Sequence, residues 1–185
     1  AAGQAAPPPP PPGRAAAGTA APPPLAGAGA GGSAPPLAGA AAPSGKLQSL
    51  SFEVLTMSQG GRYQPRNIGA IWIADASGKL VKTLQVWARI RQRYLFKYNA
   101  ARASMPVDVT ASATLTSHQV HRVSWDLKDR SGAAVAPGQY SVQIEVTDKD
   151  AAGATAQFPF DLTLGPTVLM PTSSPGYTQI KLQLQ

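Results

Sequence analysis

The chain has 185 residues and a formal net charge of +7, and its 19 Pro and 18 Gly make up a fifth of it. It contains no Cys, which excludes disulfide frameworks, thiolate metal sites and cysteine nucleophiles. No apolar run approaches the roughly 20 residues of a membrane-spanning helix, so the sequence predicts no membrane span.

Residues 1–45 have the composition of a disordered linker. Pro (12 residues), Gly (9) and Ala (17) fill 38 of these 45 positions, and Arg14 is the only charged residue. Such a segment has too little apolar side chain to offset the entropy of ordering it, so we predict a flexible, partly polyproline tether. The chain begins with Ala, and an Ala-rich start is typical of a chain after signal-peptide cleavage. We therefore expect a periplasmic or secreted bacterial protein.

Residues 46–185 are predicted to fold as one domain of β-strands. Alternation of apolar and polar residues, clearest in the last three segments, predicts seven strands, at 50–57, 68–74, 80–87, 121–127, 140–147, 157–164 and 180–185. Turn-forming clusters separate them, at 75–78, 129–132, 137–138 and 148–153. Short strands joined by tight turns predict an all-β fold, an immunoglobulin-like antiparallel β-sandwich of about seven strands.

One segment, residues 88–117, does not fit this alternation. Its residues 89–102 match both a helical stripe and a strand, and we predict an insertion, a loop with a short helix, that displays basic and aromatic side chains at one edge of the sandwich. Residues 62–102 hold nine Lys or Arg against one acidic residue, Asp75. This charge predicts an anionic partner, either an anionic lipid surface or another envelope component, a phosphate-bearing cofactor or an acidic protein, unless it is only a solvated basic face. No nucleic-acid-binding module accompanies the charge, which argues against nucleic acid.

The sequence offers little for catalysis or metal binding. His118 and His121 are the only histidines, and no nucleophile-elbow motif accompanies them. Residues three apart on a strand point to opposite faces, so this pair does not suit a metal ion. The aspartates at 126, 129, 148 and 150 lack the spacing of a calcium loop. We predict no catalytic residue and no metal site, and expect a protein that is not an enzyme by itself.

Residues 125–146, WDLKDRSGAAVAPGQYSVQIEV, resemble the immunoglobulin-like module at the end of flagellar hook-capping proteins and of many secreted bacterial proteins. In that pattern Trp125 fills the core, the Gly turn reverses the chain, and Pro137-Gly138 precedes a strand on which Tyr140 points inward. The resemblance implies a fold and no activity.

A longer resemblance covers nearly all of residues 46–185. The order GGRYQPRNIGAIWIAD, GKLVKTLQVWA, RYL and VDVTASAT before the Trp125 module is similar to a predicted periplasmic family, domain of unknown function 2271. Within it, Asp108-Val-Thr-Ala-Ser-Ala-Thr114 is similar to the acceptor motif of FAD:protein FMN transferases, although Val109 and Ala111 depart from the usual residues. The resemblance implies that Thr114 carries FMN through a phosphoester bond. It implies that Asp108 and Ala113 are recognition positions, and that Ser112 stands at a cofactor-site position usually occupied by Gly.

If this is correct, the protein is an extracytoplasmic electron carrier that meets a membrane flavin or haem reductase. Arg91 and Arg93 are candidates to neutralise the phosphate, and Trp87 and Tyr94 are candidates to stack on the flavin ring, as are Trp72 and Tyr98. The alternative is an unmodified polar loop in a non-catalytic immunoglobulin-like binding or structural module of the cell envelope. That module would use its basic edge, or add a partner strand at residues 182–185.

Overall fold

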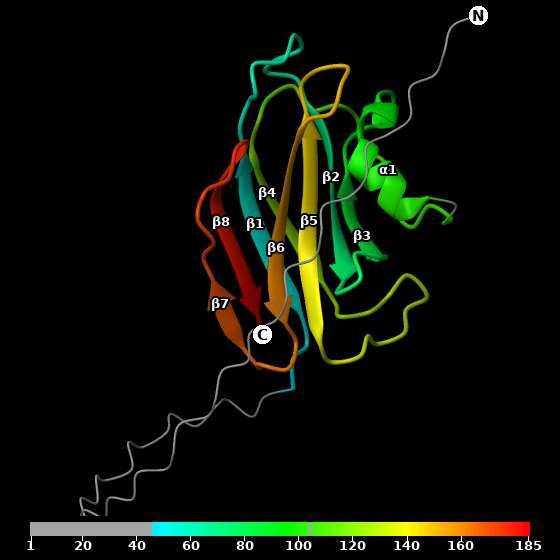
Figure 1. The fold of residues 1–185 in the computed structure, drawn as a ribbon, viewed down its shortest axis with the longest axis vertical. Helices are drawn as coiled ribbons and strands as arrows, with labels where there is room; N and C mark the ends of the chain where they lie inside the picture. The colour runs from blue at the N-terminus through cyan, green and yellow to red at the C-terminus, as the bar shows by residue number, and fades with distance from the viewer. Residues whose placement is uncertain (1–45, 104) are drawn as a thin grey trace, which may run out of the picture. The chain divides into compact units, whose positions relative to one another are not determined.

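The structure, a computed structural model, describes residues 46–103 and 105–185. The linker predicted at residues 1–45 lies outside this part of the chain. The described residues form two antiparallel sheets of four strands each, which face one another as a sandwich (Figure 1). The predicted all-β sandwich is confirmed.

The chain passes back and forth between the two sheets, adding one or two strands to a sheet each time. The first sheet has the order β4-β1-β8-β7 and the second the order β3-β2-β5-β6. The strands of the first sheet are β1 (Leu50–Thr56), β4 (Val120–Trp125), β7 (Thr167–Leu169) and β8 (Tyr177–Leu184). Those of the second sheet are β2 (Ile68–Asp75), β3 (Leu80–Val86), β5 (Gln139–Thr147) and β6 (Ala154–Asp161).

The pairing of these strands is that of an immunoglobulin-like sandwich. The hairpins β2–β3 and β5–β6 meet through β2 and β5, which reproduces the order C′-C-F-G of an immunoglobulin sheet. In the opposite sheet β1 pairs with β4 as strand B pairs with E, and the C-terminal β8 takes the place of strand A. The Tyr140 hydroxyl, at the start of β5, donates to the Ala136 carbonyl at 2.7 Å, as in the tyrosine corner of this fold.

Alternate residues of the strands form the core between the sheets. Phe52 on β1 contacts Phe158 on β6 with ring centroids 5.5 Å apart, and Trp125 lies 5.6 Å from the ring of Tyr140. The period-two pattern of these strands is therefore confirmed. Burying each such large side chain contributes about 1.5 to 3 kcal/mol, which makes this cluster the main source of stability.

The outer face of the second sheet is covered by a third layer, which the sequence did not predict. The layer holds a 3₁₀ turn, η1 (Gln92–Tyr94), and a short helix, α1 (Phe96–Arg102), as Figure 1 shows. Leu95 and Tyr98 of this layer contact an outer cluster from β2 and β3, formed by Ile68, Ala70, Trp72, Ala74, Leu80, Val86 and Ala88.

This layer corrects two expectations. The alternation in β5 predicted a solvated face, but Ser141, Gln143 and Glu145 are all at most 4% exposed, and Glu145 accepts a hydrogen bond from the backbone of α1. The segment 88–117 was expected at an edge of the sandwich. Its helix instead lies over the outer face of the second sheet, because Leu95 and Tyr98 bury their side chains there.

The predicted turns form as expected. At Asp75 and again at Asp129 the carboxylate accepts the backbone N–H and hydroxyl of the serine two residues later, at 2.6 to 2.9 Å. The glycine that follows, Gly78 or Gly132, has a positive φ of 82° or 87°, which a residue with a side chain rarely adopts.

Three predictions about the C-terminal strands are wrong. β7 was missed because three residues are too few to show alternation. β6 ends at Asp161, where the carboxylate accepts the N–H and hydroxyl of Thr163 and turns the chain. Residues 182–184 are not at an edge, because β8 pairs with β1 on one side and with β7 on the other.

Within the described residues, α1 has only seven residues and no helix is long and apolar enough to cross a membrane.

Candidate functional site

The segment 108–115 lies along the free edge of β3 and the start of β2. Backbone hydrogen bonds hold it: Ser112 N–H donates to Val86 O at 2.9 Å, and Arg89 N–H donates to Ser112 O at 3.1 Å. Asn67 and Leu115 exchange two backbone hydrogen bonds, at 3.0 and 3.1 Å. The segment is therefore an extended loop in a fixed register, and it covers the β3 edge.

Asp108 fixes the beginning of this loop. Its carboxylate accepts the backbone N–H of Thr83 at 2.8 Å and lies 3.6 Å from Nε of Arg130, with 11% of the side chain exposed. An acceptor at this point satisfies an N–H of the β3 edge that no neighbouring strand pairs. Asp108, expected as a recognition position, thus has a structural contact in the folded protein.

The other site residues expected in this loop, Ser112, Ala113 and Thr114, differ in exposure. Ser112 and Ala113 are exposed, and the Ser112 hydroxyl donates to Val86 O at 3.2 Å. Thr114 is half-buried, and among the described residues its hydroxyl makes no hydrogen bond within the 3.5 Å limit for such bonds. The two anchored neighbours, Ser112 and Leu115, fix the backbone on both sides of Thr114.

A basic hollow of about 510 Å³ lies beside the end of this loop. Its lining consists of Arg62, Tyr63, Gln64, Pro65, Arg66 and Thr116. The pairing of Asn67 with Leu115 brings the two segments together, so the hollow begins two residues after Thr114. The two guanidinium groups and the tyrosine of the hollow are distant from Thr114 in the chain, and the pairing of Asn67 with Leu115 brings them to the end of its loop.

Three arginines and two tyrosines next to this hollow form an arginine–tyrosine cluster: Arg62, Tyr63, Arg91, Arg93 and Tyr94. The guanidinium of Arg91 lies 4.0 Å from the Tyr63 ring centroid, and that of Arg93 lies 4.8 Å from the Tyr94 ring centroid. These distances are those of cation–π contacts.

Asp150 is the acidic residue of this cluster. It accepts from Arg62 Nη2 at 2.7 Å, from Arg91 Nε at 3.1 Å and from the Tyr63 hydroxyl at 2.6 Å. The Tyr63 hydrogen bond, aided by Arg91 and Arg62, lowers the pKa of Asp150 below its ordinary value of 3.8. One carboxylate against three guanidinium groups leaves the cluster with a net positive charge.

Sequence reasoning found only part of the cluster. Arg91, Arg93 and Tyr94 were expected, whereas Arg62, Tyr63 and Asp150 were not. A signal was available, because the dipeptide Arg-Tyr occurs twice, at 62–63 and at 93–94. Both copies place a guanidinium over the neighbouring ring, with the Arg62 guanidinium 4.6 Å from the Tyr63 centroid.

Trp87 does not belong to this surface. It is 0% exposed, its Nε1–H donates to Asn67 Oδ1 at 2.9 Å, and its ring stacks on His121 at 4.1 Å. Trp72 on β2 and Tyr98 on α1 are also buried, and their rings contact each other. In contrast to these three buried rings, the rings of Tyr63 and Tyr94 in the cluster are partly exposed and open to a ligand.

Neither histidine is placed for acid–base catalysis at neutral pH. Burial lowers the pKa of His121 from 6.5 to about 4, with His118 adding to the effect, and burial also lowers the pKa of His118. His121 Nδ1 contacts Gln85 Oε1 at 3.1 Å. The part of the chain that the structure describes contains no group of three His, Asp or Glu side chains that could bind a metal ion.

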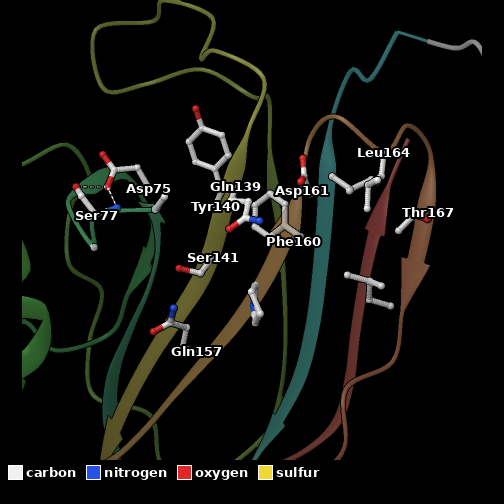
Figure 2. A pocket seen from close by; sticks show the side chains of 15 residues that line it. Asp75, Ser77, Gln139, Tyr140, Ser141, Gln157, Phe160, Asp161, Leu164 and Thr167 are labelled. Carbon is white, nitrogen blue, oxygen red and sulfur yellow. Dashed lines mark hydrogen bonds between the residues drawn. The ribbon is translucent and has the colours of Figure 1, made fainter. Parts of the chain in front are cut away.

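A larger hollow, of about 700 Å³, lies at the other end of the second sheet, where β2 ends and β5 begins (Figure 2). Asp75, Ser77, Gln139, Tyr140 and Asp161 contribute polar groups to it. Both carboxylates already accept hydrogen bonds from their own turns, and the Tyr140 hydroxyl is bonded to Ala136. Because these three polar groups already have internal partners, this hollow is the weaker candidate.

Comparison with known proteins supplies the family. No curated protein matches the chain, and no solved structure matches it. The sequence profile of a family described as "Predicted periplasmic protein (DUF2271)" matches residues 49–180, which include strands β1 to β7, the first half of β8 and the whole loop 108–115. The chain therefore belongs to this predicted periplasmic family, domain of unknown function 2271.

Proposed function

We propose that the protein is a periplasmic electron carrier that holds FMN covalently on Thr114. In the attachment step the Thr114 hydroxyl oxygen forms a bond to the flavin-side phosphorus of FAD. The pyrophosphate bond breaks, AMP leaves, and the hydroxyl proton passes to a base of the FAD:protein FMN transferase. The product is a phosphodiester between Thr114 and riboflavin, and no oxidant or reductant is consumed.

One observation carries this proposal. Thr114 has a hydroxyl without a hydrogen bond to another described residue within the 3.5 Å limit, and its loop borders a hollow lined by Arg62 and Arg66. Guanidinium groups bind phosphate oxygens in a planar, two-pronged geometry, so this hollow suits the phosphate of an attached nucleotide. Arg62 and Arg66 therefore suit the phosphate of a covalently attached FMN.

The cluster also offers contacts for the flavin ring. Tyr63 and Tyr94 are half-buried tyrosines that already accept guanidinium groups against their faces, and an aromatic ring can use the same faces. When bound, a flavin exchanges electrons with a partner, while the protein supplies orientation and electrostatics. Arg91 and Arg93 would place positive charge beside it. Trp87 has no part in this proposal because it lies in the core.

The partners follow from this chemistry. Attachment requires an FAD:protein FMN transferase in the same compartment, and reduction requires a membrane flavin or haem reductase. The transferase would meet Ser112 and Ala113, which are exposed, before it meets Asp108, which is mostly buried. We therefore expect the transferase to recognise the loop in its extended form or to detach its Asp108 end.

The proposal is tested by intact mass and visible spectrum of the protein purified from its native envelope fraction. We expect a mass increase of one FMN minus one water and a flavin absorbance, both lost in Thr114→Ala and both kept in Thr114→Ser. Thr110→Ala is a matched control in the same loop, and it should not change the mass. An unmodified wild-type mass, or modification that persists in Thr114→Ala, would contradict the proposal.

The second candidate is a non-catalytic immunoglobulin-like binding or structural module of the cell envelope. The contacts of Asp108 with Thr83 and of Ser112 with Val86 favour it, because they give the loop a structural purpose without modification. Such a module would bind an anionic envelope component or an acidic protein through the arginine–tyrosine cluster. A colourless protein of unmodified mass that retains such binding would support this candidate.

A further inference from the structure

A second surface, which shares Arg91, Arg93 and Tyr94 with the arginine–tyrosine cluster, combines exposed apolar and basic side chains. It consists of residues 89–97, which we call the basic ridge. Ile90 is 78% exposed and Phe96 is 53% exposed, so two large apolar side chains are exposed within one short segment. Arg89, Arg93 and Lys97, on either side of them, are exposed as well.

The ridge carries uncompensated positive charge. Residues 76–107 contain seven Lys or Arg and no Asp or Glu. The acidic residues that approach from other elements are already engaged: Asp150 with Arg62 and Arg91, and Glu145 with the N–H of Tyr98. Asp108, on the following loop, contacts Thr83 and Arg130.

The ridge has a fixed shape, so its exposed apolar residues are not a consequence of fraying. Leu95 is 0% exposed and is anchored in the outer cluster directly beside Phe96. Asn99 Nδ2 donates to Gln92 O at 2.7 Å and ties the 3₁₀ turn to α1. Figure 1 shows this part of the chain on the side of β2 and β3 that faces away from the first sheet.

We propose that the basic ridge docks the domain onto an anionic lipid surface. Ile90 and Phe96 enter the headgroup region, and Arg89, Arg93 and Lys97 contact lipid phosphates. Membrane interfaces accept protruding apolar side chains to a depth of about 5 to 10 Å and attract neighbouring cations. A protein partner would need roughly 800 Å² of complementary surface on each side, which a nine-residue turn does not supply.

This docking goes beyond the proposed electron carrier and does not require FMN. It would still affect the same loop, because Arg89 of the ridge donates its N–H to Ser112 O at 3.1 Å. A docked ridge would therefore hold the loop that bears Thr114 near the lipid surface. That position suits exchange with a membrane-bound partner.

The test uses the unmodified full chain and vesicles of phosphatidylcholine with or without phosphatidylglycerol. We expect co-sedimentation only with the anionic vesicles, and less of it as salt rises. The double variant Ile90→Ser/Phe96→Ser should bind about tenfold more weakly, since it removes two inserted apolar side chains. Arg93→Gln/Lys97→Gln should also weaken binding.

Matched controls come from exposed residues elsewhere. Leu164 and Met170 are 67% and 74% exposed, so Leu164→Ser/Met170→Ser removes similar apolar surface away from the ridge. Lys181→Gln removes an exposed charge from β8. Both controls should bind like the wild type, and all variants should keep the wild-type unfolding midpoint.

A second measurement reports the orientation directly. The chain has no Cys, so Ile90→Cys or Leu164→Cys can each be labelled uniquely with an environment-sensitive dye. We expect a blue shift on anionic vesicles for the dye at 90 and none for the dye at 164. Equal binding of the Ile90→Ser/Phe96→Ser variant and the wild type would overturn lipid docking. So would binding to polyglutamate in place of vesicles, which would indicate an acidic protein partner.

Discussion

Glu145 is the side chain on which the third layer of this domain depends most. It lies on β5, is 1% exposed, and accepts the N–H of Tyr98 at 2.9 Å. The N–H groups of Phe96 and Lys97 also stabilise its carboxylate. The first N–H groups of a helix have no partner within the helix, so this carboxylate from the sheet caps α1.

Glu145→Ala should therefore loosen α1 from the sheet. The change leaves buried N–H groups without an acceptor, at about 1 to 3 kcal/mol, and removes a favourable helix-dipole contact of about 0.3 to 1 kcal/mol. We expect a total loss of about 1.3 to 4 kcal/mol in the free energy of unfolding. For a folded part of about 140 residues, this lowers Tm by roughly 4 to 14 °C.

Glu145→Gln should behave differently, because its amide oxygen still accepts a hydrogen bond. Burial raises the pKa of Glu145 above its ordinary value of 4.5, and the amide hydrogen bonds only partly oppose this. The folded protein therefore keeps a proton that the unfolded chain has lost. This contribution to stability is complete below pH 4.5 and is lost as pH rises through the raised pKa. Gln should cost less than about 1 kcal/mol and should remove this part of the pH dependence.

The assay is urea unfolding of the wild type and both variants, followed by tryptophan fluorescence between pH 4 and 8. Trp72 reports on the layer because its ring lies 5.5 Å from that of Tyr98. The reasoning would be refuted if Glu145→Ala and Glu145→Gln lowered the free energy of unfolding equally. The Glu145 carboxylate would then not act as a hydrogen-bond acceptor for α1. A loss below about 1 kcal/mol for Ala would refute it too.

Two further predictions concern the core around Trp87. In Gly69→Ala the new Cβ would lie 2.3 Å from Trp87 Cζ2 and 2.6 Å from Glu145 O, so we expect a loss of about 2 to 3 kcal/mol in urea unfolding. In the double variant Gly69→Ala/Trp87→Phe the loss of stability should be smaller than the sum of the losses of the two single variants. Full additivity would show that the Trp87 ring is not what the new Cβ clashes with. His121, with its pKa lowered from 6.5 to about 4, is protonated in the unfolded chain before it is in the folded one. Stability should therefore fall as pH drops from about 6.5 to about 4, by at most about 3 kcal/mol. An NMR titration of the His121 ring with a midpoint near 6.5 would contradict this.

Strand positions and turns could be predicted from sequence because their causes are local. Phe158 and Phe160 alternate with polar residues, and alternation of this kind follows from the strand backbone itself. Asp75 and Asp129 bond to serines two residues away, so their turns need no distant partner. The acceptor-like loop was located by its resemblance to a family motif, which is also a property of one short segment.

Which faces are buried was decided only by tertiary contacts. Glu145 looked like a solvated strand residue, yet it meets Tyr98, 47 positions away in the chain, because α1 folds over β5. Trp87 looked like a ring for cofactor stacking, yet Asn67 and His121 enclose it. Local patterns do not contain such contacts, because each depends on two distant segments being brought together.

The candidate site shows the same division. From the sequence alone, the loop that bears Thr114 and the basic residues Arg91 and Arg93 could be proposed as parts of one site. Only the tertiary structure joined Tyr63 to them through Asp150, with the Tyr63 hydroxyl 2.6 Å from that carboxylate. The physical reason is that charge and alternation are properties of one segment, whereas a site requires the strand pairing that places separate segments side by side.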